Sequence, residues 1–200
     1  MHLALIFLAF FIILPISAPI FMHHGLEEPA RIIYWVYSYF CHQFAYRSWF
    51  LFGEQPYYPL DKANMSQILT YEEVFQADET DEILARAIIG TEHLGYKMAF
   101  CQRDLAMYAA LFLFGIIFLA FGRKIKRIPF IIWLIVAVIP LGLDGFIQLA
   151  GNISGLTQIQ WESTPFLRTL TGGLFGFMSG WFLFPSIESV FQRNLPISLD

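Results

Sequence analysis

The chain has 200 residues, of which 57% are hydrophobic, 18% are aromatic and only 14% are charged, and its formal net charge is −4. Soluble domains carry roughly 25% charged residues, so this composition excludes an ordinary soluble domain and indicates a protein of the lipid bilayer. The negative net charge argues against nucleic acid as a partner. Two cysteines are too few for a disulfide scaffold, but they suffice for one bridge or one shared metal ion.

The first apolar run extends from Leu3 to Met22 and has about the 20 residues that a helix needs to cross a bilayer. The only basic side chain before it is that of His2, and the nearest small-residue cleavage signal, Ser17-Ala18, is followed by Pro19. A secretory signal peptide normally has a charged start and a clear cleavage site. We therefore expect residues 1–24 to form a retained N-terminal anchor helix.

An aromatic segment with embedded polar residues follows at 25–53. The segment from Arg31 to Phe52 is expected to form a second helix, and it contains the polar string Cys41-His42-Gln43. Its charges and tyrosines suit a helix lying at the membrane interface better than a clean span.

Residues 54–98 are expected to form a small acidic insert, because nine of the sixteen acidic residues lie between Glu54 and Glu92. Within this insert, two segments, Ser66 to Phe75 and Asp81 to Gly90, predict short helices.

Residues 99–200 are expected to form a bundle of three further spans, at Leu105 to Gly122, Ile128 to Leu149 and Pro165 to Phe184. In the last span Gly172, Gly176 and Gly180 recur at four-residue intervals, a pattern that lets two helices approach closely. The predicted fold is an all-α, multi-pass protein of the cell membrane with about four transmembrane helices, one interfacial helix and the acidic insert.

A short basic loop sets the expected orientation. Residues 122–127 contain four lysines and arginines, and such loops mark the cytoplasmic side of a membrane. The acidic insert is then extracytoplasmic, and so are the ends of the spans that adjoin it. The polar residues that we expect to meet at this outer face are Cys41, His42, Gln43, Arg47, Cys101, Arg103, Asp104, Asp144, Gln148 and Arg168.

Four strings in this order, CHQFAYRSWFLFG, FCQRDLAMY, PLGLDGFIQLAG and FLRTLTGGLFG, resemble the predicted integral membrane proteins grouped as domain of unknown function 2085. The resemblance covers Tyr34 to Gly53 and Tyr96 to Phe184, and it implies a membrane fold and the position of a site. Where some members of that family carry a second cysteine in the second motif, this chain has Asp104. A longer acidic insert also separates the first two motifs here.

Three states of the cysteines are consistent with the sequence. Cys41, His42, Cys101 and Asp104 are candidate ligands of a metal ion, with zinc as the candidate, because thiolate, imidazole and carboxylate groups all bind zinc. His42 and Cys41 could reach one ion only if the helix is broken there. Alternatively, Cys41 and Cys101 form a disulfide, which an extracytoplasmic location allows, or both remain free thiols.

Two classes of function fit these residues. In the first, a membrane enzyme acts on a lipid headgroup or another amphiphile, with a metal ion, or Asp104 and Asp144 as acid and base, activating water. The residues expected to bind the substrate are Gln43, Arg47, Arg103, Gln148 and Arg168. In the second class, the chain is a structural or accessory subunit that contacts other membrane subunits. A transporter is disfavoured, because no polar residue lies deep within a span.

Overall fold

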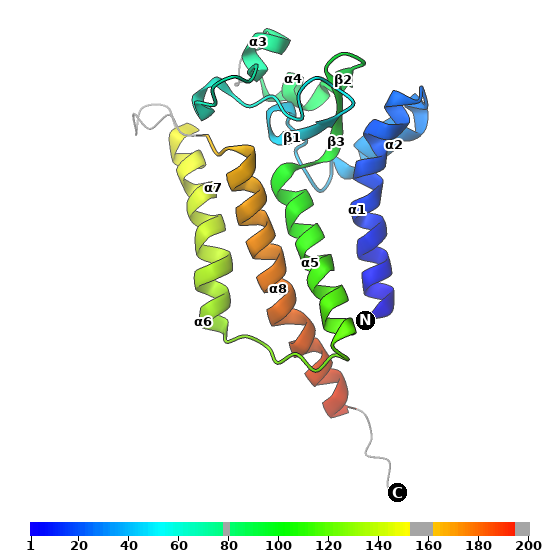
Figure 1. Cartoon of the computed structure of the whole chain (residues 1–200), viewed down its shortest axis with the longest axis vertical. Coiled ribbons are helices and arrows are strands. Elements are labelled where there is room, and N and C mark those ends of the chain that lie inside the picture. The colour runs from blue at the N-terminus through cyan, green and yellow to red at the C-terminus, as the bar shows by residue number, and fades with distance from the viewer. Residues whose placement is uncertain (78–80, 153–161, 195–200) are drawn as a thin grey trace, which may run out of the picture.

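The computed structural model describes residues 1–77, 81–152 and 162–194, and in this part the chain is mostly helical with a small sheet at one end of the helices (Figure 1). Four helices here are long and apolar enough to cross a membrane. They are α1 (His2–His23), α5 (Gln102–Ala120), the combined helix formed by α6 (Phe130–Trp133), the π-helical η3 (Leu134–Val138) and α7 (Ile139–Asn152), and α8 (Pro165–Asn194). The sequence predicted spans at these four places, and a helix of sufficient length and apolar character is confirmed at each.

The four long helices lie side by side in the order α7, α8, α5 and α1, and α5 packs most extensively against α8 (Figure 1). The glycine stripe of α8 makes this approach possible. A Cβ atom on Gly176 would lie 1.9 Å from the carbonyl oxygen of Met107, and one on Gly172 would lie 2.4 Å from that of Arg103. The stripe therefore packs against the backbone of α5, as small residues commonly do where helices associate within a membrane.

Helix α1 is hydrogen-bonded to the aromatic segment at a carbonyl group that a proline leaves without a helical donor. Pro15 has no N–H group, so the carbonyl of Phe11 one turn earlier loses its helical donor. The hydroxyl of Tyr37 donates to this carbonyl over 2.9 Å. The aromatic segment that follows α1 thus satisfies a backbone group that α1 leaves free.

The aromatic segment itself is not one long helix. Helix α2 (Glu27–Tyr37) ends at Tyr37, so the predicted helix from Arg31 to Phe52 is wrong. The chain continues through an irregular stretch into the 3₁₀ turn η1 (Ala45–Arg47) and strand β1 (Ser48–Leu51). The string Trp49-Phe50-Leu51 favours a strand once a partner strand is available, because aromatic residues fit a pleated, half-buried surface.

The partner strand is β3 (Gly95–Cys101), which leads directly into α5. It pairs antiparallel with β1 on one side and with β2 (Gly90–Thr91) on the other. The all-α prediction is therefore only approximate.

The acidic insert has an apolar core shared with the aromatic segment. Two short helices, α3 (Tyr71–Phe75) and α4 (Glu82–Ala87), lie within the two segments that the sequence predicted as helical, and the 3₁₀ turn η2 (Asp61–Ala63) precedes them. Buried aromatic and aliphatic side chains join the two parts: Phe44, Ala45, Tyr46, Phe50, Tyr58, Leu60, Tyr71 and Ala85. The insert thus packs directly on the segment that carries the Cys-His-Gln string.

The close contact between α5 and α8 leads to a stability prediction. We expect Gly176→Leu to lower the free energy of unfolding in mixed micelles by about 2 kcal/mol or more, because overpacking forces the backbones apart. Gly173→Leu on the same helix is the matched control, since a Cβ there meets no atom within 4 Å. Equal destabilisation by both substitutions would contradict the packing account.

Candidate functional site

The Cys-His-Gln segment is held in place by two buried polar side chains. Gln43 adopts a left-handed backbone conformation with φ of +56°, and its side-chain amide donates to the carbonyl of Tyr34 over 2.9 Å. Lys97, which is fully buried in β3, donates to the carbonyl of Gln43 over 2.8 Å and to that of Arg86 over 2.6 Å. These bonds connect α2, α4 and β3 to the loop that carries Cys41.

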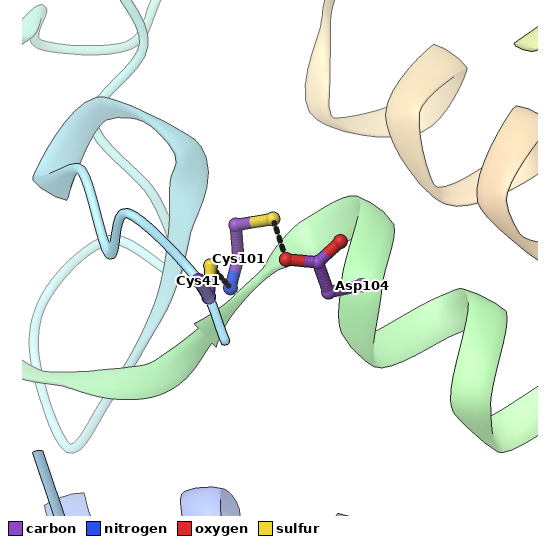
Figure 2. Close-up of side chains that lie close together, drawn as sticks. All are labelled: Cys41, Cys101 and Asp104. Atoms are coloured by element: carbon purple, nitrogen blue, oxygen red, sulfur yellow. Dashed lines mark hydrogen bonds between the residues drawn. The ribbon is translucent and has the colours of Figure 1, made fainter. Parts of the chain in front are cut away.

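The two cysteines meet where β3 becomes α5 (Figure 2). The backbone N–H of Cys101 donates to Cys41 Sγ over 3.3 Å, and the Cys101 thiol donates to Asp104 Oδ2 over 3.0 Å. The Cys41–Cys101 pair lies at 3.6 Å, and no disulfide bond joins the two residues. The ligand atoms of Cys41, Cys101 and Asp104 all lie within 4.8 Å of one another.

His42 is not part of this group. Its side chain is exposed, and its ring stacks on that of Phe44 with a centroid distance of 5.4 Å. The helix is broken at this position, as a shared site with Cys41 would need, but the imidazole turns toward the neighbouring aromatic ring.

The three grouped residues open into a cavity of about 180 Å³. Most of the candidate residues from the sequence analysis line it: Cys41, His42, Gln43, Phe44, Arg47, Cys101, Arg103, Asp104 and Arg168. Asp144 and Gln148 do not line the cavity, but the carboxylate of Asp144 pairs with Arg103 and accepts a hydrogen bond from Gln148 over 3.4 Å. The segments carrying these residues lie far apart in the sequence and converge at one end of the bundle.

The arginines around the cavity are already paired. Arg103 pairs with Asp144, while Arg168 and Arg47 share the carboxylate of Glu162, which is only 4% exposed. With both thiols protonated, three guanidinium groups and three carboxylates balance one another around this site. The arginines therefore neutralise carboxylates of the protein in addition to any role toward a ligand.

Glu162 is the residue that the sequence analysis missed. It bridges η1 to the start of α8, where Arg168 also donates to the carbonyl of Ser163 over 3.0 Å. The sequence does carry a signal for this residue, because Glu162 is an acidic residue just before the predicted start of the last span. An ionisable group near a span is expected to have an inward-facing partner.

Among the groups outside the spans, Cys41 and Lys97 both have shifted pKa values. A hydrogen-bonding interaction with the side chain of Cys101, followed by burial and the nearby carboxylate of Asp104, raises the pKa of the Cys41 thiol. Burial lowers the pKa of Lys97 to about 7, against an opposing effect from Cys41. Cys41 is therefore a neutral thiol near pH 7 unless a cation replaces its proton.

Comparison with known proteins agrees with the family resemblance. The profile of a family described as "Predicted membrane protein (DUF2085)" matches residues 92–182. The expected resemblance is confirmed. This range contains Cys101, Arg103 and Asp104, whereas the Cys-His-Gln string lies before it.

An uncharacterized protein of the archaeon Methanocaldococcus jannaschii is 28% identical over 164 residues, which cover 80% of this chain and 72% of that protein. No solved structure matches the chain.

The ion pairs of Glu162 lead to a second stability prediction. We expect Glu162→Gln to lower the free energy of unfolding by about 3–5 kcal/mol, because it leaves the buried guanidinium of Arg168 without its carboxylate. Glu27→Gln breaks an ion pair with Arg31 whose side chains are about 60% exposed, and it should change stability by no more than about 0.5 kcal/mol. Similar losses in the two variants, measured by denaturant titration in micelles, would refute a structural role for Glu162.

Lys97 predicts a pH dependence of stability. Its folded-state pKa of about 7 lies below the ordinary lysine value, so above pH 7 the unfolded chain binds more protons than the folded one. The contribution of Lys97 to stability therefore rises with pH from about 7 toward the ordinary lysine pKa of 10.5. The wild type should become more resistant to unfolding over this window, and Lys97→Met should remove that increase. If the stability of Lys97→Met rose with pH as steeply as that of the wild type, Lys97 would not be the source of the pH dependence.

Proposed function

We propose that this chain is a multi-pass membrane protein that binds one divalent metal ion, with zinc as the favoured ion, through Cys41, Cys101 and Asp104. The observation that carries the proposal is the approach of two thiols and one carboxylate to within 4.8 Å of one another beside a cavity. Thiolate sulfur selects zinc over magnesium or calcium, which prefer oxygen ligands.

The spacing of the two cysteines supports a shared ion. In tetrahedral zinc sites a Zn–S bond of about 2.3 Å places two thiolates about 3.8 Å apart, and the cysteines here approach to 3.6 Å. Backbone N–H groups of Cys101 and Gln43 already point at Cys41 Sγ. Such donors stabilise a thiolate, as groups around a metal site generally do for its ligands.

The charge balance also supports an ion of charge +2. Binding such an ion would convert two neutral thiols to thiolates, so two positive charges would arrive as two protons leave. The net charge of the site would then be the same as in the balanced, metal-free arrangement. Because the carboxylate of Asp104 raises the pKa of the Cys41 thiol, its proton leaves only when a cation of higher charge takes its place.

A fourth ligand to the ion would be water, or His42 after rotation away from Phe44. Catalytic zinc sites generally have three protein ligands and one water molecule. The ion lowers the pKa of that water, which makes the water a better nucleophile near neutral pH. We propose an anionic amphiphile, such as a lipid headgroup, as the substrate. Arg47 and Arg103 line the cavity and would contact its anionic group.

The remaining candidate residues have supporting roles in this proposal. Asp104 would act as a ligand, and Asp144 would orient Arg103 and not exchange protons with the substrate, since it does not line the cavity. The side-chain amides of Gln43 and Gln148 are engaged with Tyr34 and Asp144. Arg168 would position Glu162 and, through it, Arg47.

We also propose that this site is extracytoplasmic. The sheet and the acidic insert lie at the end of the helices opposite the loop that joins α5 to α6 (Figure 1). That loop carries four basic residues, and short basic loops remain on the cytoplasmic side.

A second candidate rests on the same pair of sulfurs. Cysteines that approach to 3.6 Å need only a small movement to form a disulfide, which oxidising compartments permit. The bridge would then join the aromatic segment to α5, and the chain would act as a structural or accessory subunit of a membrane assembly.

The metal proposal predicts about one zinc ion per chain in detergent-purified protein, measured by elemental analysis together with thiol counting. Cys41→Ser, Cys101→Ser and Asp104→Asn should each lose most of the bound metal. Zinc affinity should rise with pH, by up to about tenfold per unit for each proton displaced, because the raised pKa of Cys41 keeps its thiol protonated without the ion.

Glu28→Gln is the control for loss of an acidic charge, since Glu28 is exposed in the first turn of α2 and is not one of the grouped ligands. If the purified protein contains no metal and no titratable thiol, the disulfide alternative is correct and the metal proposal is wrong. Metal-free protein with two titratable thiols that does not take up added zinc would refute both.

A further inference from the structure

A second charged feature lies at the opposite end of the bundle. The loop between α5, which ends at Ala120, and α6, which begins at Phe130, contains Arg123, Lys124, Lys126 and Arg127. Both flanking helices are long and apolar enough to span a bilayer, and a chain inserted through them has this loop at the bilayer surface. Figure 1 shows it running past α8 at the lower end of the helices.

The loop is fixed against α8. The indole N–H of Trp181 donates to the carbonyl of Lys126 over 3.0 Å, and Arg123 pairs with Glu188 over 3.7 Å. An open groove of about 680 Å³ separates the loop from the last turns of α8. The residues that the argument uses line this groove: Arg123, Lys124, Lys126, Arg127, Glu188 and Ser189.

The positive charge of this groove is largely uncompensated. Within the described part of the chain, Glu188 is the only acidic residue that lines it, and Glu188 is paired with Arg123. The exposed side chains of Lys124, Lys126 and Arg127 form no hydrogen bond or ion pair with any described residue. The hydroxyl of Ser189 already donates within α8, to the carbonyl of Ser186. The groove therefore offers free cationic groups and few free neutral donors.

We infer that this groove binds the phosphate-bearing headgroup of an anionic membrane lipid in the adjacent leaflet. Clusters of lysine and arginine immediately beside a membrane-spanning helix attract anionic headgroups, and each basic side chain contributes roughly a fivefold change in affinity. The position of the groove at the bilayer surface favours a lipid over a soluble anion, because lipid phosphates lie at that depth. This inference does not depend on the metal site at the other end.

The test compares retention of two short-chain lipids, phosphatidylglycerol and phosphatidylcholine, on the detergent-purified full chain by native mass spectrometry. The wild type should retain phosphatidylglycerol in preference, and added salt should weaken that preference. The double variant Lys126→Gln, Arg127→Gln should bind phosphatidylglycerol about 25-fold more weakly. The control double variant Arg31→Gln, Arg86→Gln removes two exposed charges from other segments and should bind like the wild type.

Thermal unfolding of both double variants shows whether either substitution disrupts the fold. Equal retention of phosphatidylglycerol by a folded Lys126→Gln, Arg127→Gln variant would overturn the inference. Displacement of the lipid by inorganic phosphate at comparable concentration would also overturn it, because the site would then prefer a soluble anion. A single substitution, Lys126→Gln, tests the same point if the double variant does not fold, with a loss of about fivefold.

Discussion

Antiparallel pairing of β1 with β3 holds the candidate site together. In this ladder Ser48 lies opposite Cys101, and Phe50 lies opposite Lys97, with an irregularity between the two pairs. The pairing brings the loop that carries Cys41 to the start of α5, although about 60 residues separate the two cysteines. A shift of the register by one residue would turn Lys97 away from the interior and remove its bonds to the loop.

Buried polar groups then set the geometry around the cysteines. Lys97 ties the loop to α4, and Glu162 ties η1 to α8 through two arginines. Groups of this kind are costly to bury unless every partner is present. Their presence is understandable if the site must be rigid, because a metal ion requires its ligands within a few tenths of an ångström of their ideal positions.

The two ends of the molecule differ in their chemistry. At the sheet end, positive and negative side chains are paired and largely buried, with thiols in their midst. At the loop end, basic side chains are exposed and largely without partners among the described residues. The first arrangement suits selective binding of a small ion, and the second suits electrostatic attraction to a charged surface.

Much of this architecture could be predicted from the sequence, because long apolar runs and a glycine stripe are strong signals. The sequence also predicted that Cys41, Cys101 and Asp104 would lie close together, since each is at the end of its segment that was expected at the outer face. The strand pairing was missed, because Ser48–Leu51 and Gly95–Cys101 are too short for their periodicity to be decisive.

The role of individual side chains was harder to predict. Exclusion of His42 from the grouped ligands depends on its contact with Phe44, which no sequence pattern specifies. Similarly, the pairing of Asp144 with Arg103 depends on how α7 and α5 each pack against α8, and not on spacing within one helix.

X-ray absorption spectroscopy of the zinc-loaded protein tests the central claim most directly, because it measures which atoms surround the ion. The account predicts two sulfur atoms at about 2.3 Å together with oxygen or nitrogen at about 2.0–2.2 Å, and loss of one sulfur in Cys41→Ser. A first shell without sulfur, or one unchanged in Cys41→Ser, would contradict the claim that Cys41 and Cys101 share one ion.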